Sequence, residues 1–220
     1  MTEPAHESVA GLSKHRIEAL ADGIFAVAMT LLVLDIKLPE SVTYATDADL
    51  WRRLVALEHA VASYAVSFVM LSVYWIAHHF QFHFIHRTDR GVLWINLYLL
   101  LCITLVPFTT DLVGDNVQLR LPILLYGANL LLIGLGFAGQ LRYLRRRPWL
   151  ASPEFASRPI AELRRRIVLL ALVPILSMGL VFYSPRLALY LYLALPLLHM
   201  LPGRLDRMTL PSSIRRRRSP

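Results

Sequence analysis

Six stretches of about 20 mostly apolar residues dominate this chain of 220 residues. A helix needs about 20 such residues to cross the roughly 30 Å hydrocarbon core of a bilayer. The chain is 56% hydrophobic and 17% charged, with a mean hydropathy of +0.51. These figures exclude a disordered chain and an ordinary water-soluble enzyme domain. We therefore expect an all-α membrane protein with six spans, at residues 17–37, 55–80, 92–113, 121–141, 167–183 and 187–203.

The remaining sequence predicts one membrane domain with short ends. Residues 1–15 lack the basic start, apolar centre and small-residue cleavage site of a secretory signal, so the first span is expected to insert the chain. We expect an N-terminal segment at 1–15, a transmembrane domain at 16–203 and a basic tail at 204–220. The single cysteine, Cys102, cannot form an intramolecular disulfide.

Basic residues are distributed unevenly between the two sides of this topology. With both termini on one side, that side holds 18 of the 23 Lys and Arg residues. Because loops rich in Lys and Arg stay in the cytoplasm, both termini are expected there. This bias accounts for most of the net charge of +8 without nucleic acid. The run Arg215–Arg218 is expected to be disordered or to touch anionic headgroups, and a more specific partner stays open.

Asp22 is the charged residue of the first span that most needs an explanation. A charge at bilayer depth is costly, and so it is usually paired or functional. Arg16 lies six residues earlier, about 120° away around a helix, so partners of both are expected on other helices or subunits. Alternatively, Asp22 lies at headgroup level, where the positive end of the helix dipole favours an anion.

Three residues of the same span share one helix face. Val27, Thr30 and Leu34 lie within about 60° of one another, because they are spaced by three and four residues. Such a stripe is typical of a packing seam between helices, and also of a pore wall with a hydrophobic constriction. Spacing alone favours the seam.

Histidines and polar residues of the next two spans raise further alternatives. His79, His83 and His86 have the spacing of one helical stripe, with His78 offset, and could bind a metal. Amphipathic interfacial histidines are the simpler interpretation, and no metal is expected. Asn96, near Trp94 in span three, is expected at about the depth of Asp22 and His78. Three helices would thus bring polar groups to one level, which favours a buried network.

With these residues in view, the chain resembles the bacterial branch of the transmembrane protein 175 family of potassium channels. The family begins its first helix with Arg, three residues, then Phe-Ser-Asp; here Arg16 and Asp22 match, while Leu20 and Ala21 replace Phe and Ser. The run that follows Asp22 is also similar, as are the patterns around Trp75 to Phe82, around Trp94 and Asn96, and at Pro107 to Thr110. The similarity covers roughly residues 14–115.

The resemblance implies a homotetramer in the bacterial inner membrane, with the first helices around a central pore and no cofactor. Val27 would match the constriction residue, Thr30 the polar selectivity layer and Leu34 a further hydrophobic ring. A structural network would hold the first helix in place. It would join six residues: Arg16, Asp22, His78, His79, Trp94 and Asn96.

The expected function is a passive, moderately selective potassium channel rather than an enzyme. No Thr-Val-Gly-Tyr-Gly stretch occurs, so a carbonyl-lined filter is not available. A proton-coupled or cation secondary transporter is the main alternative, since Asp22, Asp35 and the histidines could titrate. Inverted repeats and broken helices, which many transporters show, are not evident. A metal or haem enzyme using His79, His83 and His86 is the least favoured alternative.

Overall fold

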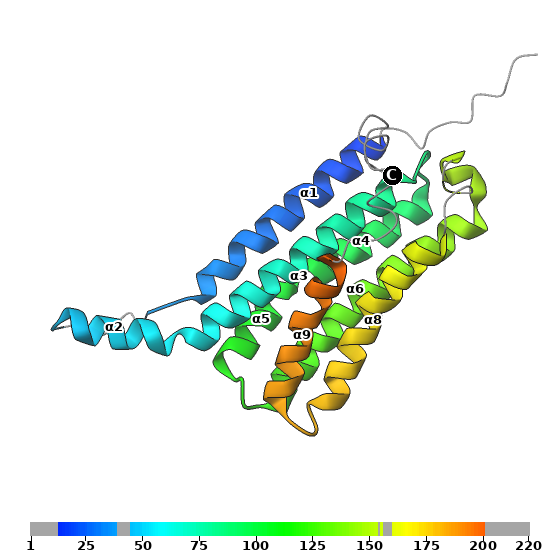
Figure 1. Ribbon diagram of the computed structural model, residues 1–220. Helices are drawn as coiled ribbons and strands as arrows, with labels where there is room; N and C mark the ends of the chain where they lie inside the picture. Colours follow the sequence, from blue (N-terminus) through cyan, green and yellow to red (C-terminus); the bar gives the residue numbers. More distant parts are fainter. Residues whose placement is uncertain (1–12, 39–44, 154, 156–159, 201–220) are drawn as a thin grey trace, which may run out of the picture.

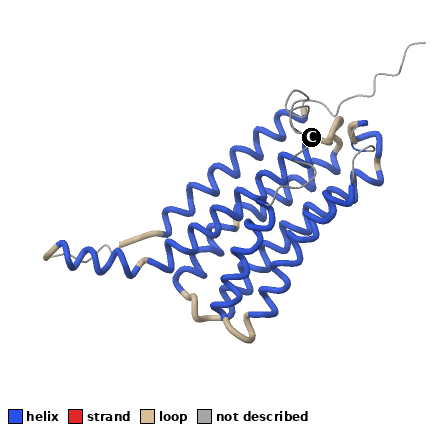
Figure 2. The backbone as a smooth tube through the Cα atoms, in the orientation of Figure 1, coloured by secondary structure: helices blue, strands red, loops and turns tan. Residues whose placement is uncertain are grey.

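The computed structural model describes residues 13–38, 45–153, 155 and 160–200 as a bundle of helices (Figure 1). In the described residues only helices and loops occur (Figure 2), apart from one isolated bridge between Ile85 and Ala151. Four segments are long and apolar enough to cross a membrane: Lys14–Asp35, Glu58–His83, Arg90–Asp115 and Arg120–Arg146. The last two expected spans correspond to α8 (Ile160–Leu180) and α9 (Pro185–Met200). The apolar stretch of α8, Ile167–Leu180, is shorter than the four long segments. Residues 201–203 of the last expected span lie outside the described residues. The count of six spans therefore stays a prediction.

The first span consists of α1 (Lys14–Leu31) and the 3-10 turn η1 (Leu32–Asp35). Its inner side is a row of residues spaced by three or four positions, which is the period of one helix face. This row is buried and comprises Ile17, Ala21, Phe25, Ala28 and Leu32. Through it α1 packs on α3 and α4, so one side of the helix is fixed to the bundle.

A short helix that the sequence analysis did not predict follows the first span. Helix α2 (Asp47–Ala56) has no buried residue and projects away from the bundle (Figure 1). Thr46 caps it, because its hydroxyl oxygen accepts a hydrogen bond from the Asp49 N–H at 3.2 Å. The second span, α3 (Glu58–His83), consequently begins and ends three residues later than expected.

The third span is divided into α4 (Arg90–Thr104) and α5 (Val106–Asp115), where one helix was expected at 92–113. Pro107 is the cause, since it has no N–H to donate to the carbonyl four residues earlier. Leu105 between the two helices keeps a right-handed helical conformation, so the segment continues across the membrane.

Helix α6 (Arg120–Arg146) occupies the centre of the bundle between α4 and α8. Glycines allow its close packing: a Cβ on Gly134 would lie 3.0 Å from the Leu170 carbonyl oxygen of α8. Two side chains of α3 reach its backbone. The Tyr74 hydroxyl donates to the Leu130 carbonyl at 3.3 Å, and the Gln81 amide donates to the Phe137 carbonyl at 3.0 Å.

One end of the bundle is tied together by its loops, and we call it the basic end: it comprises the start of α1, residues 84–90 and residues 142–153. Backbone N–H groups of His86 and Arg87 donate to the Leu150 carbonyl, within the 3-10 turn η2 (Pro148–Leu150). Asp89 caps α4 by accepting from the Val92 N–H at 2.9 Å. The same carboxylate accepts from the Tyr143 hydroxyl at 2.7 Å and pairs with Arg147 at 2.9 Å.

Candidate functional site: the outer face of the first helix

The side of α1 that faces away from the bundle is broad and unburied. Val27 is 56% exposed and Leu34 57%, and Thr30 is also exposed. On a helical projection Val27 and Thr30 lie near the middle of the exposed arc, opposite Phe25 and Ala21. The structure thus places the three residues outside the core that the helices of one subunit form. This argues against a packing seam between helices of the same subunit.

Leu34 does not continue the α-helical stripe as expected. It lies on η1, where each residue advances about 120° instead of about 100°. Over three residues this rotates Leu34 by about 60° from the position that an α-helix would give it. Leu34 stays exposed, but it lies farther round the helix from Thr30 than the spacing predicted.

The hydroxyl group of Thr30 has a defined orientation. It donates a hydrogen bond of 2.8 Å to the Val27 carbonyl, one turn earlier on the same helix. Because its only hydrogen is used there, the oxygen presents its lone pairs away from the helix backbone. An exposed hydroxyl oxygen in this state can accept from water or coordinate a cation.

Asp22 finds its partner on α3. Its Oδ1 atom accepts from the Trp75 Nε1–H at 2.8 Å, and both residues are exposed on the subunit. Trp75 also lies against the His79 ring, with centroids 6.0 Å apart. The sequence analysis did not place Trp75 in the network, although its position one turn before His79 was the signal that could have identified it.

His78 and Asn96 meet in the interior, between α3 and α4. The His78 Nε2 atom and the Asn96 Oδ1 atom are 2.8 Å apart, and both residues are almost fully buried. The imidazole ring lies 5.9 Å from the Phe25 ring of α1 and 4.3 Å from the Phe82 ring. This pair therefore lies against the buried side of α1, where Phe25 contacts the imidazole ring.

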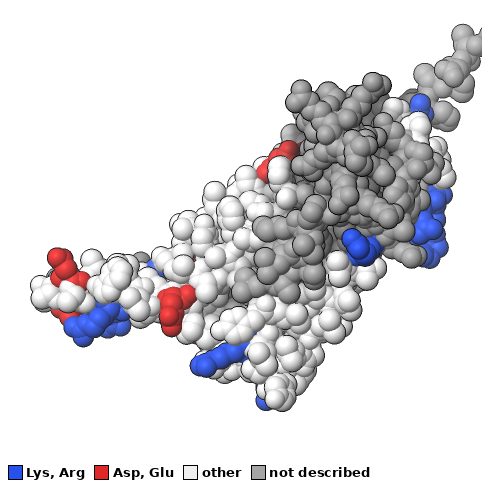
Figure 3. All heavy atoms as spheres, in the orientation of Figure 1, with Lys and Arg blue, Asp and Glu red and all other residues white. Residues whose placement is uncertain are grey.

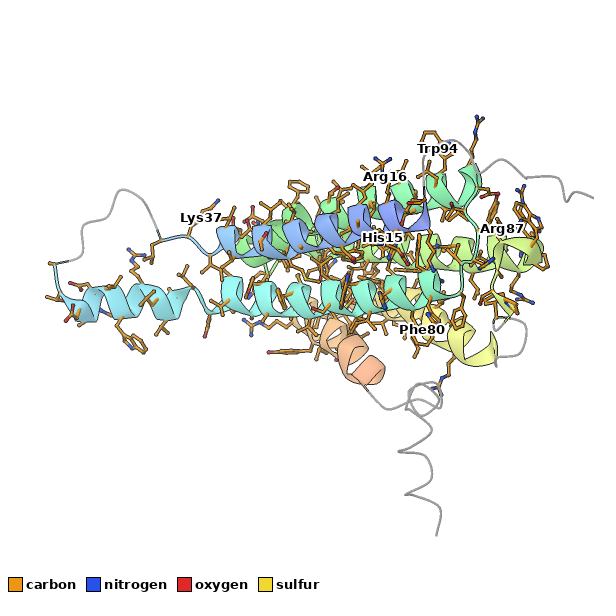
Figure 4. The ribbon with its side chains drawn as sticks, turned by 90° about the horizontal axis from the view of Figure 1, so that it is seen from above. His15, Arg16, Lys37, Phe80, Arg87 and Trp94 are labelled. Atoms are coloured by element: carbon orange, nitrogen blue, oxygen red, sulfur yellow. The ribbon has the colours of Figure 1, made fainter. Side chains whose placement is uncertain are left out.

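Two further residues of the expected network lie on the outer surface of the subunit. Trp94 is 70% exposed at the start of α4, in an outward stripe with Tyr98 and Leu101. Arg16 is exposed near the start of α1, at the same end of the bundle as Trp94, whereas Lys37 lies at the opposite end (Figure 4). The structure brings Asp22 to Trp75 and His78 to Asn96, but it does not bury Trp94 between them.

The expected histidine stripe is interrupted by the end of a helix. Helix α3 ends at His83, so His86 lies in the following loop and does not share a helical face with His79. Within the described residues, no three His, Cys, Asp or Glu side chains are grouped so that they could hold a metal ion. No metal chemistry is derived from these residues.

We predict that Trp75→Phe loosens the attachment of α1 to α3. The change keeps an aromatic ring but leaves the Asp22 carboxylate without this donor, at an expected cost of about 1–2 kcal/mol. Thermal unfolding of the purified protein measures it, in a cycle with Asp22→Leu and the double variant. If the loss of stability in the double variant equals the sum of the two single losses, the Asp22–Trp75 hydrogen bond contributes nothing.

These features define an α-helical membrane protein whose first helix exposes a hydroxyl between apolar side chains. A family model described as the endosomal/lysosomal potassium channel TMEM175 matches residues 16–107. A Streptomyces collinus protein named as a potassium channel is 32% identical over 79% of this chain and 85% of its own length. The chain belongs to the TMEM175 family.

Further relatives include a solved structure and vertebrate proteins. The crystal structure of a lysosomal potassium-selective channel TMEM175 homologue from Chamaesiphon minutus has a TM-score of 0.73 and 27% identity. The match covers 86% of this chain and 96% of that one. A Danio rerio protein named as an endosomal/lysosomal proton channel TMEM175 is 31% identical over 56% of this chain. This chain spans only 23% of that protein. The family is thus one of channels, named for two different ions.

Proposed function

We propose that this protein is a passive potassium-preferring cation channel, in which four copies of α1 surround a central path. The observation that carries the proposal is the outer face of α1, where Val27 and Thr30 are exposed although the helix is fixed to the bundle on its other side. The names of the Streptomyces collinus and Chamaesiphon minutus relatives support potassium as the permeant ion.

The chemistry of this face suits partial dehydration of a cation. A ring of four Thr30 oxygens replaces some hydration oxygens, because each hydroxyl hydrogen is held by the Val27 carbonyl. Apolar rings of Val27 and Leu34 make the loss of water costly, which penalises the more tightly hydrated sodium ion. A filter made of side chains is only moderately selective.

The polar contacts behind α1 have a positioning role in this proposal. Asp22 is held by Trp75 at one edge of the exposed face, and the His78–Asn96 pair lies behind Phe25. Both contacts resist rotation of α1, and rotation would turn Thr30 out of the path. Arg16, His79 and Trp94, at the same level of the bundle, are proposed to complete this network through contacts between subunits.

The proposed setting is the inner membrane of a bacterium, with six spans per subunit and the basic end in the cytoplasm. The unequal distribution of Lys and Arg supports this orientation. With an even number of spans both termini lie on the cytoplasmic side.

The second candidate is a proton-coupled or cation secondary transporter. The proton-channel name of the Danio rerio relative favours proton movement of some kind. Potassium and sodium flux into liposomes with purified protein separates the two. A channel gives flux that follows the ion gradient without saturating, whereas a carrier gives saturating flux that needs a proton gradient. Cross-linking of the same sample counts the subunits.

Cysteine accessibility tests the path directly, in a Cys102→Ala background. We expect Val27→Cys and Thr30→Cys to react with a charged, membrane-impermeant thiol reagent and to lose at least about 90% of potassium flux. Leu135→Cys is the matched control, because Leu135 on α6 is 51% exposed in the subunit but lies away from α1. If Val27→Cys and Thr30→Cys are as unreactive as the control, α1 does not line the path.

A further inference from the structure

A cavity opens between α6 and α8 at the basic end of the bundle. Its volume is about 470 Å³, within the range of cavities that hold small molecules. The apolar part of its lining includes Ala138 of α6, and Ile167 and Val168 of α8. It begins about one helical turn beyond Gly134, where α6 and α8 pack closely enough that a Cβ would lie 3.0 Å from the Leu170 carbonyl oxygen.

Three arginines form the other part of the lining. Arg142, Arg145 and Arg146 are spaced by three and four residues, so they project from one face of the last two turns of α6. All three are exposed, and none pairs with a carboxylate in the part of the chain that the structure describes. The adjacent Arg147, by contrast, is paired with Asp89. The cavity therefore joins an apolar floor to three positive charges that have no carboxylate partner among the described side chains.

The position of this cavity determines which ligand can reach it. Helix α8 lies on the opposite side of the bundle from α1 (Figure 1). Lys and Arg side chains gather on the visible surface where α6 ends (Figure 3). In a membrane, the arginines lie at headgroup level and the apolar floor lies at the level of the acyl chains, since Val168 is 51% exposed within an apolar helix.

We propose that this groove, formed by Ala138, Arg142, Arg145, Arg146, Ile167 and Val168, binds one anionic phospholipid. The phosphodiester lies between the guanidinium groups, which donate charge-assisted hydrogen bonds to its oxygens. One acyl chain lies along Val168 and Ala138. The site is separate from the ion path proposed above, and its occupancy does not depend on channel activity.

Native mass spectrometry of the purified full chain in detergent tests the proposal, with phosphatidylglycerol and phosphatidylcholine as probes. We expect phosphatidylglycerol to be retained at least about tenfold better. The variant with Arg142→Gln, Arg145→Gln and Arg146→Gln is expected to bind it about 100-fold more weakly, at about fivefold per charge. Equal retention of the two lipids by the unmodified chain would overturn the proposal.

Two controls separate a site from general charge attraction. Arg215→Gln with Arg216→Gln and Arg217→Gln removes the same amount of charge from the basic tail, and phosphatidylglycerol binding should change less than threefold. An equal loss in both triple variants would mean that no defined groove exists. Val168→Trp fills the apolar floor without changing charge, and it should weaken lipid binding about tenfold. Unchanged binding would exclude the acyl-chain position.

Inorganic phosphate distinguishes a lipid site from a phosphate site. At millimolar concentration it should not displace phosphatidylglycerol, because it cannot occupy the apolar floor. Complete displacement would assign the arginines to a soluble anion instead. Circular dichroism and thermal midpoints that match those of the unmodified protein show that each variant is folded, independently of its ion flux.

Discussion

Replacing Thr30 by valine is expected to lower the ratio of potassium to sodium permeability about fivefold, toward no selectivity. Valine has nearly the same shape, so the width of the path changes little. The change removes the hydroxyl oxygen, whose lone pairs face away from the backbone because its hydrogen is bound to the Val27 carbonyl. This oxygen coordinates the cation, and a difference of about 1 kcal/mol between the two ions in that coordination corresponds to a factor of about five. Reversal potentials in planar bilayers measure it.

Thr30→Ser is the matched variant for this experiment. Serine keeps the hydroxyl and can donate to the same carbonyl, so the reversal potential should stay within a few millivolts of its original value. An unchanged reversal potential in Thr30→Val would remove Thr30 from the filter. A change in Thr30→Ser as well would show that the shape of this side chain, and not its hydroxyl alone, determines the permeability ratio.

Asp89→Ala is expected to lower the stability of the subunit by about 2–3 kcal/mol, the largest loss that we predict for a single polar residue. About 1 kcal/mol comes from the lost cap of α4, whose Val92 N–H is left without its acceptor. The Tyr143 hydroxyl loses a bond of 2.7 Å in a half-buried position, which adds a similar amount. The Arg147 pair adds less, because nearly half of that side chain is exposed. Thermal or denaturant unfolding in detergent measures the loss.

Asp89→Asn separates these contributions. Asparagine caps helices about as well as aspartate, because its one carbonyl oxygen can accept from the Val92 N–H in place of Oδ1. Its amide group then takes the place of Oδ2, and the Tyr143 hydroxyl can accept from the amide instead of donating. The main loss is the charge next to Arg147, so we expect less than about 1 kcal/mol. Equal losses in the two variants would show that the ion pair, and not the hydrogen bonds, stabilises this end.

The sequence predicted the long helices well because length and hydropathy determine which segments can cross a bilayer. It did not predict the division at Leu105, since a single proline is tolerated in many membrane helices and Pro107 gave no measure of its local effect. Helix α2 was also missed, although the sequence contained a signal. Thr46 and Asp49 have the spacing of a helix cap, directly before an amphipathic run.

The candidate site was predictable in part, because helical periodicity and the position of a residue along its span can both be read from the sequence. The spacing of Val27 and Thr30 gave their shared face, and the depth of His78 and Asn96 gave their contact. Depth does not give rotation, however, and so the sequence did not distinguish Trp94, which is exposed, from Trp75, which donates to Asp22. Which side of a helix faces a neighbour depends on the packing of whole helices. In a membrane the lipid-facing side is as apolar as the packed side, so hydropathy does not distinguish the two.

The two bonds from α3 to the α6 backbone limit how a subunit can change shape. Tyr74 and Gln81 are seven residues apart, and so are their acceptors, Leu130 and Phe137. These two bonds therefore fix the position of α3 along the axis of the parallel helix α6. Sliding one past the other would break both bonds at a depth where no water replaces them. A change of shape within the subunit is therefore expected to come from tilting or bending of helices, and not from α3 sliding along α6.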